Sequence, residues 1–385
     1  MSTSMSRRTA LRTLAAAGAG AAASRIPLAA QQAAGMTRVA AVQMHAQLGD
    51  VTANLENAER WVRLALQEGA QWVVLPEFFT TGIALHPTRL LDAYEPLDGR
   101  PMQLLKRLAR DGDACVGGSF LARSGADVFN TFVLAAPNGD VFTHDKDFPT
   151  SNIESSVYAG GEDDEYVKEL RRRAAVDHPS PIAGRAQNIK SGVLAVPGRL
   201  TVGTALCWEQ VRYRTARRLT GQVDLVLAAS GWPFSNASSA ISRPQGDARV
   251  VPTVPSESVR EAPRRLARLV GAPVVHANLV GDTWNLPANA PARLLRFSGE
   301  SQIVDAHGHT IASRRYADGE GLVIADVEAR RVTPVESIPA DGVWTPEGPS
   351  PGGDAGWYVS GAAGRTAYLT DTRPRRNAAS RNSTR

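Results

Sequence analysis

The chain has 385 residues, of which 43% are hydrophobic and 21% are charged, a balance typical of a soluble globular protein. The net charge of +5 comes from the two ends: residues 1–35 carry four arginines and no acid, residues 365–385 carry six arginines and one aspartate, and the residues between them carry −4. This distribution argues against a nucleic-acid-binding face, and the lack of an apolar run of about 18 residues argues against a stable membrane span.

The N-terminal segment has the features of an export signal. Residues 6–11 read Ser-Arg-Arg-Thr-Ala-Leu and precede a weakly apolar Ala/Gly stretch at residues 14–23. This pattern resembles a twin-arginine signal, which implies that residues 1–35 are a signal peptide and that a bacterium exports the folded protein to the periplasm or the medium. The alternative is a disordered basic tail.

From residue 36 on, short apolar runs alternate with stretches whose apolar residues recur at helical spacing. The expected strands cover residues 38–44, 72–75, 114–122, 128–135, 141–142, 200–206, 224–229, 274–278, 301–305 and 321–326. The expected helices cover residues 54–68, 102–110, 211–219 and 256–270. This alternation predicts a layered α/β architecture with mixed sheets.

Two stretches interrupt the alternation and are predicted to be surface insertions: residues 162–189, which are charged, and residues 235–256, which are rich in Ser and Pro. The end of the chain is rich first in Pro and Gly and then in Arg, Asn and Ser, and it is predicted to extend along the surface or to be disordered. Residues 36–335 are therefore expected to form the globular domain, and residues 336–385 a C-terminal extension.

The sequence contains only two cysteines. Cys115 lies in an apolar run, where a lone cysteine usually packs as a small hydrophobe, so we expect no disulfide. Cys207 follows the strand at residues 200–206 and precedes a helix, the pattern of a nucleophile elbow. At such a turn, backbone N–H groups after the thiol can hold a developing oxyanion. The alternative is a buried cysteine that only packs.

Two further residues are candidates for chemistry. Glu77 directly follows the buried strand at residues 72–75 and Pro76, at the sheet edge where active sites of open α/β folds collect. It can serve as a base for a thiol, or alternatively cap a helix or lie at the surface. Lys146 lies between two aspartates, which on its own is more typical of a solvated loop.

Taken in order, these segments resemble the nitrilase superfamily, the carbon-nitrogen hydrolases, over most of residues 37–330. The matching segments are the opening strand at residues 39–44, Leu-Pro-Glu at 75–77, Asp-Lys at 145–146, Ala-Leu-Cys-Trp-Glu at 205–209, and the later strands at 273–278 and 301–308. The resemblance implies a four-layer α-β-β-α sandwich, an assembly of several copies of the chain, and a site that needs neither metal nor cofactor.

The resemblance also implies the catalytic roles. Glu77 removes the thiol proton of Cys207, and Cys207 attacks the carbon. Lys146 stabilises the negative charge that develops, with the backbone N–H of Trp208 as a second donor. Glu154 is similar to the family's second glutamate, which orients the lysine and the attacking water; Glu162 and Glu165 are alternatives for this position.

Other residue patterns have simpler readings. His307 and His309 flank a glycine between two strands, which is more typical of a hairpin turn than of a metal site. Gly117-Gly118 lacks the Lys-Ser/Thr of a phosphate loop. Trp208 and Trp232 can line a substrate pocket or pack in the core.

The sequence thus predicts an enzyme that hydrolyses a linear amide or nitrile through a Cys207 thioester, releasing ammonia or an amine and a carboxylic acid. One alternative is an acyl transferase that passes the same thioester to an amine. Another is a catalytically silent scaffold of the same fold. A serine esterase is disfavoured because its Gly-x-Ser-x-Gly elbow is missing.

Overall fold

The structure is a computed structural model, and it describes residues 35–83, 90–150, 154–162, 172, 192–233, 257–285, 293–340, 342–344 and 353–382. The expected export signal, apart from Gly35, lies outside the described residues. So do the two expected insertions, apart from Glu162 and Arg172. Among the described helices, none is long and apolar enough to cross a membrane.

The first of two large sheets has the strand order β15-β1-β2-β4-β5-β6, with β3 paired to β4. Its strands are β1 (Thr37–Gln43), β2 (Trp72–Val74), β3 (Glu95–Pro96), β4 (Cys115–Ser124), β5 (Asp127–Ala135), β6 (Val141–Asp145) and β15 (Gly321–Val327). Strands β1, β2, β3 and β4 pair in parallel, whereas β15, β5 and β6 pair with their neighbours in antiparallel orientation. The sheet is therefore mixed, as expected.

The second sheet has the order β14-β13-β10-β9-β8-β7. Its strands are β7 (Val193–Ala195), β8 (Thr201–Leu206), β9 (Leu225–Ser230), β10 (Val274–Asn278), β13 (Ser301–Val304) and β14 (Thr310–Arg314). Strands β8, β9 and β10 are parallel at its centre, and the outer pairs are antiparallel. In a separate two-stranded sheet, β11 (Val280–Asn285) pairs with β12 (Arg293–Ser298) in antiparallel orientation.

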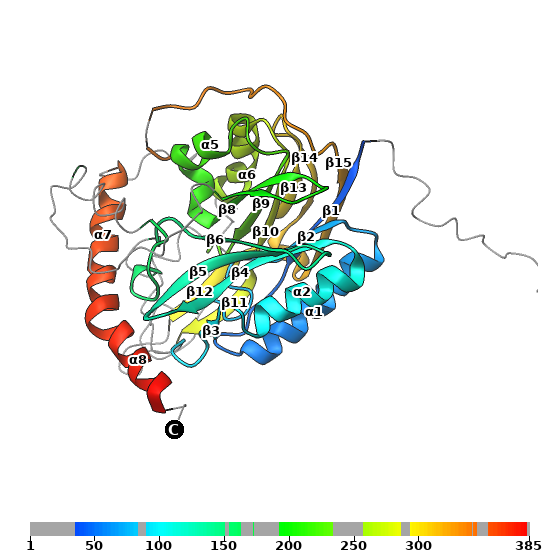
Figure 1. Cartoon of the computed structure of the whole chain (residues 1–385). Coiled ribbons are helices and arrows are strands. Elements are labelled where there is room, and N and C mark those ends of the chain that lie inside the picture. Colours follow the sequence, from blue (N-terminus) through cyan, green and yellow to red (C-terminus); the bar gives the residue numbers. More distant parts are fainter. Residues whose placement is uncertain are drawn as a thin grey trace, which may run out of the picture.

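Three hydrophobic clusters stack these elements into four layers. One cluster lies between the first sheet and helices α1 (Val51–Gln67) and α2 (Arg100–Gly112). A second cluster fills the space between the two sheets. A third lies between the second sheet and helices α5 (Tyr213–Leu219) and α6 (Glu257–Val270). Figure 1 shows α1 and α2 on one side of the sheets and α5 and α6 on the other, so the α-β-β-α prediction is confirmed.

Close packing explains the two adjacent glycines of β4. A Cβ atom on Gly117 would lie 2.7 Å from the ring of Phe132, and one on Gly118 would lie 2.7 Å from Cβ of Leu75. A Cβ atom essentially never comes this close to a non-bonded carbon atom, so only glycine lets the layers approach here. The Gly-Gly pair is a packing feature of the sheet that carries Glu77 at its edge.

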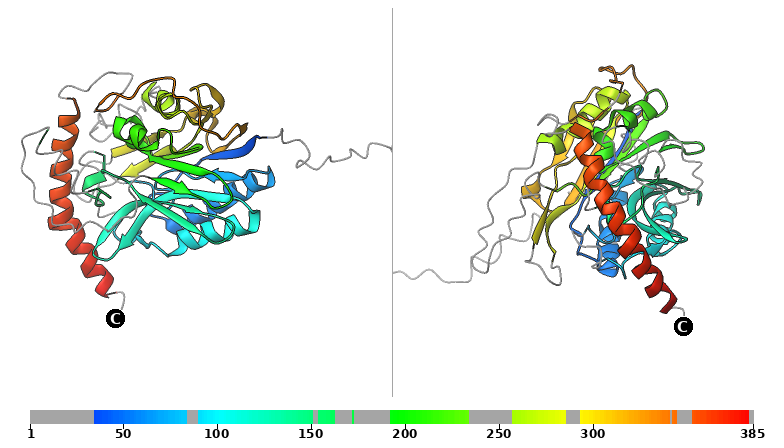
Figure 2. Two further views of the ribbon diagram at one scale, coloured as in Figure 1. Left: turned by 45° about the horizontal axis from the view of Figure 1, so that its top comes forward. Right: turned by 90° about the vertical axis from the view of Figure 1, so that its left-hand side faces the viewer.

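The C-terminal extension was predicted to extend along the surface or to be disordered, and no helix was expected there. Residues 353–382 form a nearly continuous helical rod made of α7 (Gly353–Ala367), a π-helical turn η6 (Tyr368–Thr372) and α8 (Arg373–Asn382). The rod runs along one edge of the molecule and crosses it diagonally in the side view (Figures 1 and 2). The helix propensity of these residues is weak, so the sequence gives no helix signal here. Contacts between the rod and the body of the protein stabilise the helix instead.

These contacts reach the turn at residues 154–157, next to the lysine segment. The Tyr368 hydroxyl donates to Asp127 at 3.0 Å and accepts the backbone N–H of Val128 at 3.1 Å. The Thr372 hydroxyl donates to the carbonyl of Ser156 at 2.8 Å. The rod therefore holds one side of the turn that begins with Glu154.

Replacing Thr372 by valine tests this contact. The variant keeps the shape of the side chain but leaves the buried carbonyl of Ser156 without this donor, so the free energy of unfolding should fall by about 1 kcal/mol in urea titrations. Thr370→Val is the matched control, because the Thr370 hydroxyl is exposed and bonds only to Thr366 of its own helix. Equal losses in both variants would show that the rod does not hold the turn.

Candidate active site

Cys207 is placed at a sharp turn between β8 and a short 3-10 helix, η3 (Cys207–Val211). Its φ angle is +47°, a left-handed conformation that is rare for a residue with a side chain. Such backbone conformations persist only where the surrounding structure holds them, and they are concentrated at functional sites. The thiol is buried and forms no disulfide, as expected, and Cys115 is buried within β4. The local geometry is that of a nucleophile elbow.

Glu77 follows β2 and is fully buried. One of its carboxylate oxygens accepts hydrogen bonds from Nδ2 of Asn130 at 2.7 Å and from Nζ of Lys146 at 2.9 Å. The other oxygen accepts the backbone N–H of Gly231 at 2.8 Å. Phe78, the next residue, has a φ angle of +55°, so the glutamate segment also contains a left-handed turn. These contacts orient the carboxylate from three sides.

Lys146 follows β6 and is held by its backbone as well as its side chain. Its N–H donates to the carbonyl of Asn130, and its carbonyl accepts the N–H of Gly161. The ammonium donates to Glu77 and, at 2.7 Å, to Glu154. Lys146 thus lies between two carboxylates with no exposed surface.

Glu154 is fixed by three donors on one oxygen. These are the ammonium of Lys146, the backbone N–H of Thr150 at 2.7 Å and the hydroxyl of Tyr158. Of the alternatives considered for this position, Glu162 pairs with Arg214 instead, and Glu165 lies outside the described residues. Glu154 is therefore the carboxylate that the structure brings to Lys146.

The site gathers residues from both sheets around one point. Sγ of Cys207 and one carboxylate oxygen each of Glu77 and Glu154 all lie within 4.8 Å of one another. Three such ligands in one place could suggest a metal ion, but the ammonium of Lys146 already occupies the position between the two carboxylates. The arrangement instead pairs a thiol with a base and a fixed positive charge.

Burial controls the protonation states of these groups. It raises the pKa of Glu77 to about 7, although the Lys146 ammonium opposes this shift. Burial also raises the pKa of Cys207 well above its usual value, and the negative charge of Glu77 adds to the effect. Burial lowers the pKa of Lys146, but Glu154 and Glu77 overcome it and raise that pKa well above the usual value. The resting site therefore holds a neutral thiol beside an ammonium.

Sequence reasoning missed several residues that shape this site. Asn130 lies in the buried strand β5 next to Thr131, and a polar amide among the apolar residues of this strand was the available signal. Gly231 reaches Glu77 through its backbone, which no sequence pattern reveals. Glu209 ends the cysteine segment at residues 205–209, and nothing in the sequence indicates that it is fully buried beside the site.

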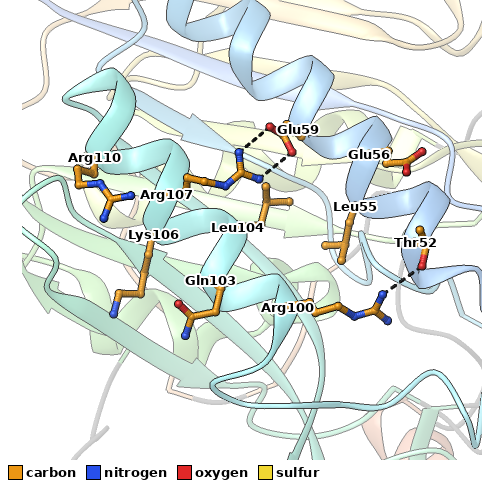
Figure 3. A pocket seen from close by; sticks show the side chains of 10 residues that line it. All are labelled: Thr52, Leu55, Glu56, Glu59, Arg100, Gln103, Leu104, Lys106, Arg107 and Arg110. Atoms are coloured by element: carbon orange, nitrogen blue, oxygen red, sulfur yellow. Dashed lines mark hydrogen bonds and ion pairs between the residues drawn. The ribbon is translucent and has the colours of Figure 1, made fainter.

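The remaining candidates lie at three other places in the structure. Trp208 and Trp232 stack with their ring centroids 5.0 Å apart and pack in the cluster that includes Cys207. His307 and His309 lie in a hairpin turn in which Asp305 accepts both of their backbone N–H groups, as predicted. A groove of about 580 Å³ between α1 and α2 is lined by charged residues such as Glu59 (Figure 3) and contains none of the four gathered side chains.

Comparisons with known proteins identify the family and the fold. Residues 38–336 match the family described as carbon-nitrogen hydrolase. A nitrilase from Pyrococcus abyssi is 31% identical over 27% of this chain and 40% of its own length, and a cyanide hydratase from Armillaria gallica is 22% identical over 61% and 67%. An amidase from Nesterenkonia sp. AN1, solved with acrylamide added to its active-site cysteine, superposes with a TM-score of 0.51 at 18% identity, covering 78% of this chain and 95% of the amidase.

Proposed function

Because this chain belongs to the carbon-nitrogen hydrolase family, we propose that it hydrolyses a small linear amide or nitrile through a covalent thioester on Cys207. The observation that carries the proposal is the meeting of a thiol, a carboxylate and an ammonium within one buried cluster. The nitrilase, cyanide hydratase and amidase similarities support the same class of substrate.

The proposed reaction of an amide has two halves. In the first, Glu77 takes the proton of the Cys207 thiol as sulfur attacks the carbonyl carbon, and it delivers that proton to the departing nitrogen as the carbon–nitrogen bond breaks. Lys146 and the backbone N–H of Trp208 stabilise the charge on the oxygen. In the second half, water gives a proton to Glu77 as its oxygen adds to the thioester carbon. Glu77 returns that proton to sulfur as the carbon–sulfur bond breaks, which releases the acid and restores the thiol.

A nitrile follows the same route with one additional water. Sulfur adds to the nitrile carbon to give a thioimidate, and water converts this adduct to the thioester as ammonia leaves. Because the raised pKa of Cys207 keeps the thiol neutral at rest, proton removal accompanies the attack in both cases. In this scheme Glu154 orients Lys146 and the water.

The pH dependence tests the role of Glu77. A base works only when it is unprotonated, so kcat/KM should fall as the pH is lowered through an apparent pKa of about 7. Because Glu77, Lys146 and Glu154 are coupled, this value belongs to the group as a whole. Initial rates measured between about pH 5 and pH 9 provide the profile. A flat profile across the neutral range would exclude Glu77 as the base.

The function itself is tested by ammonia release from a panel of paired nitriles and amides. Turnover of a nitrile would establish a nitrilase, and turnover of amides alone would establish an amidase. Trapping of the acyl group by added hydroxylamine would show the thioester in either case; the acyl transferase alternative is favoured only if an ordinary amine takes the acyl group in preference to water. Silence across the panel, with Cys207 no more reactive to alkylation than Cys115, would favour the scaffold alternative.

Export and assembly are also part of the proposal. The paired arginines at residues 7 and 8 support export, and fractionation of cells producing the full chain tests it. A homo-oligomer is expected from the family resemblance, and light scattering after gel filtration tests that expectation.

A further inference from the structure

A single buried carboxylate connects the backbone next to the nucleophile with the backbone next to the lysine. One oxygen of Glu209 accepts the N–H of Leu206, the residue before Cys207, at 2.8 Å. The other accepts the N–H of Asp147, the residue after Lys146, at 2.7 Å. The side chain has no exposed surface.

These two backbone segments belong to different sheets. Leu206 ends β8 of the second sheet, whereas Asp147 follows β6 of the first. Strands β6 and β8 are not paired with each other in the described sheets. Glu209 therefore joins the two layers at the place where the reacting groups must meet.

The carboxylate is itself held in place by His144 and Arg218. Nε2 of His144 lies 3.1 Å from both oxygens of Glu209. Arg218 forms two 2.8 Å hydrogen bonds with Asp147 and comes within 3.9 Å of Glu209. Burial alone would raise the pKa of Glu209, but His144 and Arg218 bring that pKa well below its usual value. The bridge thus carries a full negative charge, which strengthens its hydrogen bonds.

We propose that Glu209 is a positioning residue that sets the separation between Sγ of Cys207 and the Glu77–Lys146 pair by fixing the backbone beside both segments. It acts through backbone N–H groups and touches no reacting atom. The effect that we expect on kcat rests on the proposed function. A displacement of about 1 Å between reacting groups can lower a rate by about 100-fold, so a side chain outside the reaction can control it.

The test compares Glu209→Gln with Glu300→Gln. Glutamine keeps the size of Glu209 but loses its charge, and its amide nitrogen faces one of the two backbone donors. Glu300 is the matched control because it is also buried and also accepts two hydrogen bonds, one from the backbone N–H of Tyr316 and one from the side chain of Arg260. None of these contacts involves a catalytic candidate. Both variants of the full chain are compared with the parent protein for melting temperature, kcat, KM and the rate of Cys207 alkylation by iodoacetamide.

For Glu209→Gln, kcat should fall by about 100-fold while KM changes by less than about threefold, and alkylation of Cys207 should slow by about tenfold or more. Glu300→Gln should lower the melting temperature without changing kcat or the alkylation rate. Glu209→Asp keeps the charge but is too short to span both N–H groups, so it should also lose kcat; it decides the question if the glutamine variant does not fold. Unchanged kcat and alkylation in a folded Glu209 variant, or equal losses in Glu300→Gln, would overturn the proposal. Alkylation needs no substrate, so this result is separable from failure of the proposed function.

Discussion

Replacement of Cys207 by alanine is expected to lower kcat for any substrate of this protein by about 10⁴-fold or more, because no other described group in the cluster can form the covalent intermediate. The fold should tolerate the change, since alanine fits a site that holds a small neutral thiol at rest. Ammonia release under saturating substrate, together with the mass of the acyl-enzyme in the parent protein, measures the effect.

The second cysteine provides the control for this variant. Cys115 is equally buried, and burial raises its pKa to about 11, but it lies within β4 between the sheets and near none of the catalytic candidates. Cys115→Ala should cost about 1 kcal/mol of stability through lost packing and leave kcat unchanged. Comparable activity in the two alanine variants would refute the nucleophile assignment.

Replacement of Lys146 by methionine is expected to affect activity and stability together. The ammonium is fully buried and neutralises Glu77 and Glu154, so its loss leaves two carboxylates facing each other. The free energy of unfolding should fall by about 3–5 kcal/mol at neutral pH. Catalysis should fall by about 10³-fold or more, because the charge opposite the oxyanion is gone and Glu77 takes up a proton.

Two controls separate these effects. The stability deficit of Lys146→Met should shrink as the pH is lowered, because protonation of the two carboxylates removes their repulsion. The double variant Lys146→Met with Glu154→Gln removes one carboxylate and should recover part of the stability while kcat stays low. Recovery of kcat in the double variant would mean that Lys146 serves only to hold Glu154. Urea unfolding and ammonia release measure the two quantities.

Features of this structure that follow from local sequence patterns could be predicted, whereas features that depend on contacts between distant residues could not. Glu77 and Cys207 each follow an apolar strand that is visible in the sequence, so the place of each at the end of a strand could be anticipated. That they meet was implied only by the family resemblance, because β2 and β8 belong to different sheets. The layered α/β fold with mixed sheets was predicted from the same alternation and is confirmed. Family membership is confirmed as well.

Other features depend on contacts that no local pattern reveals. The bond between Glu209 and Asp147 spans 62 positions and joins two sheets, so neither residue marks it in the sequence. Strands β11 and β12 carry charged residues, such as Asp282, which pairs with Arg296. These charges interrupt the apolar pattern from which a strand could have been predicted. Helix α1 begins three residues before the expected start, because Asp50 caps it through the N–H of Ala53.

The helical rod at the C-terminal end also bears on how the protein is made. The turn that carries Glu154 receives a hydrogen bond from Thr372, a residue 216 positions further along the chain from Ser156. A ribosome must therefore add more than half of the whole chain after it has made this turn before the turn gains that support. During synthesis Cys207, Glu77 and Lys146 are all present well before the C-terminal rod that supports the turn of Glu154. A nascent chain therefore lacks this support at the site until late in translation.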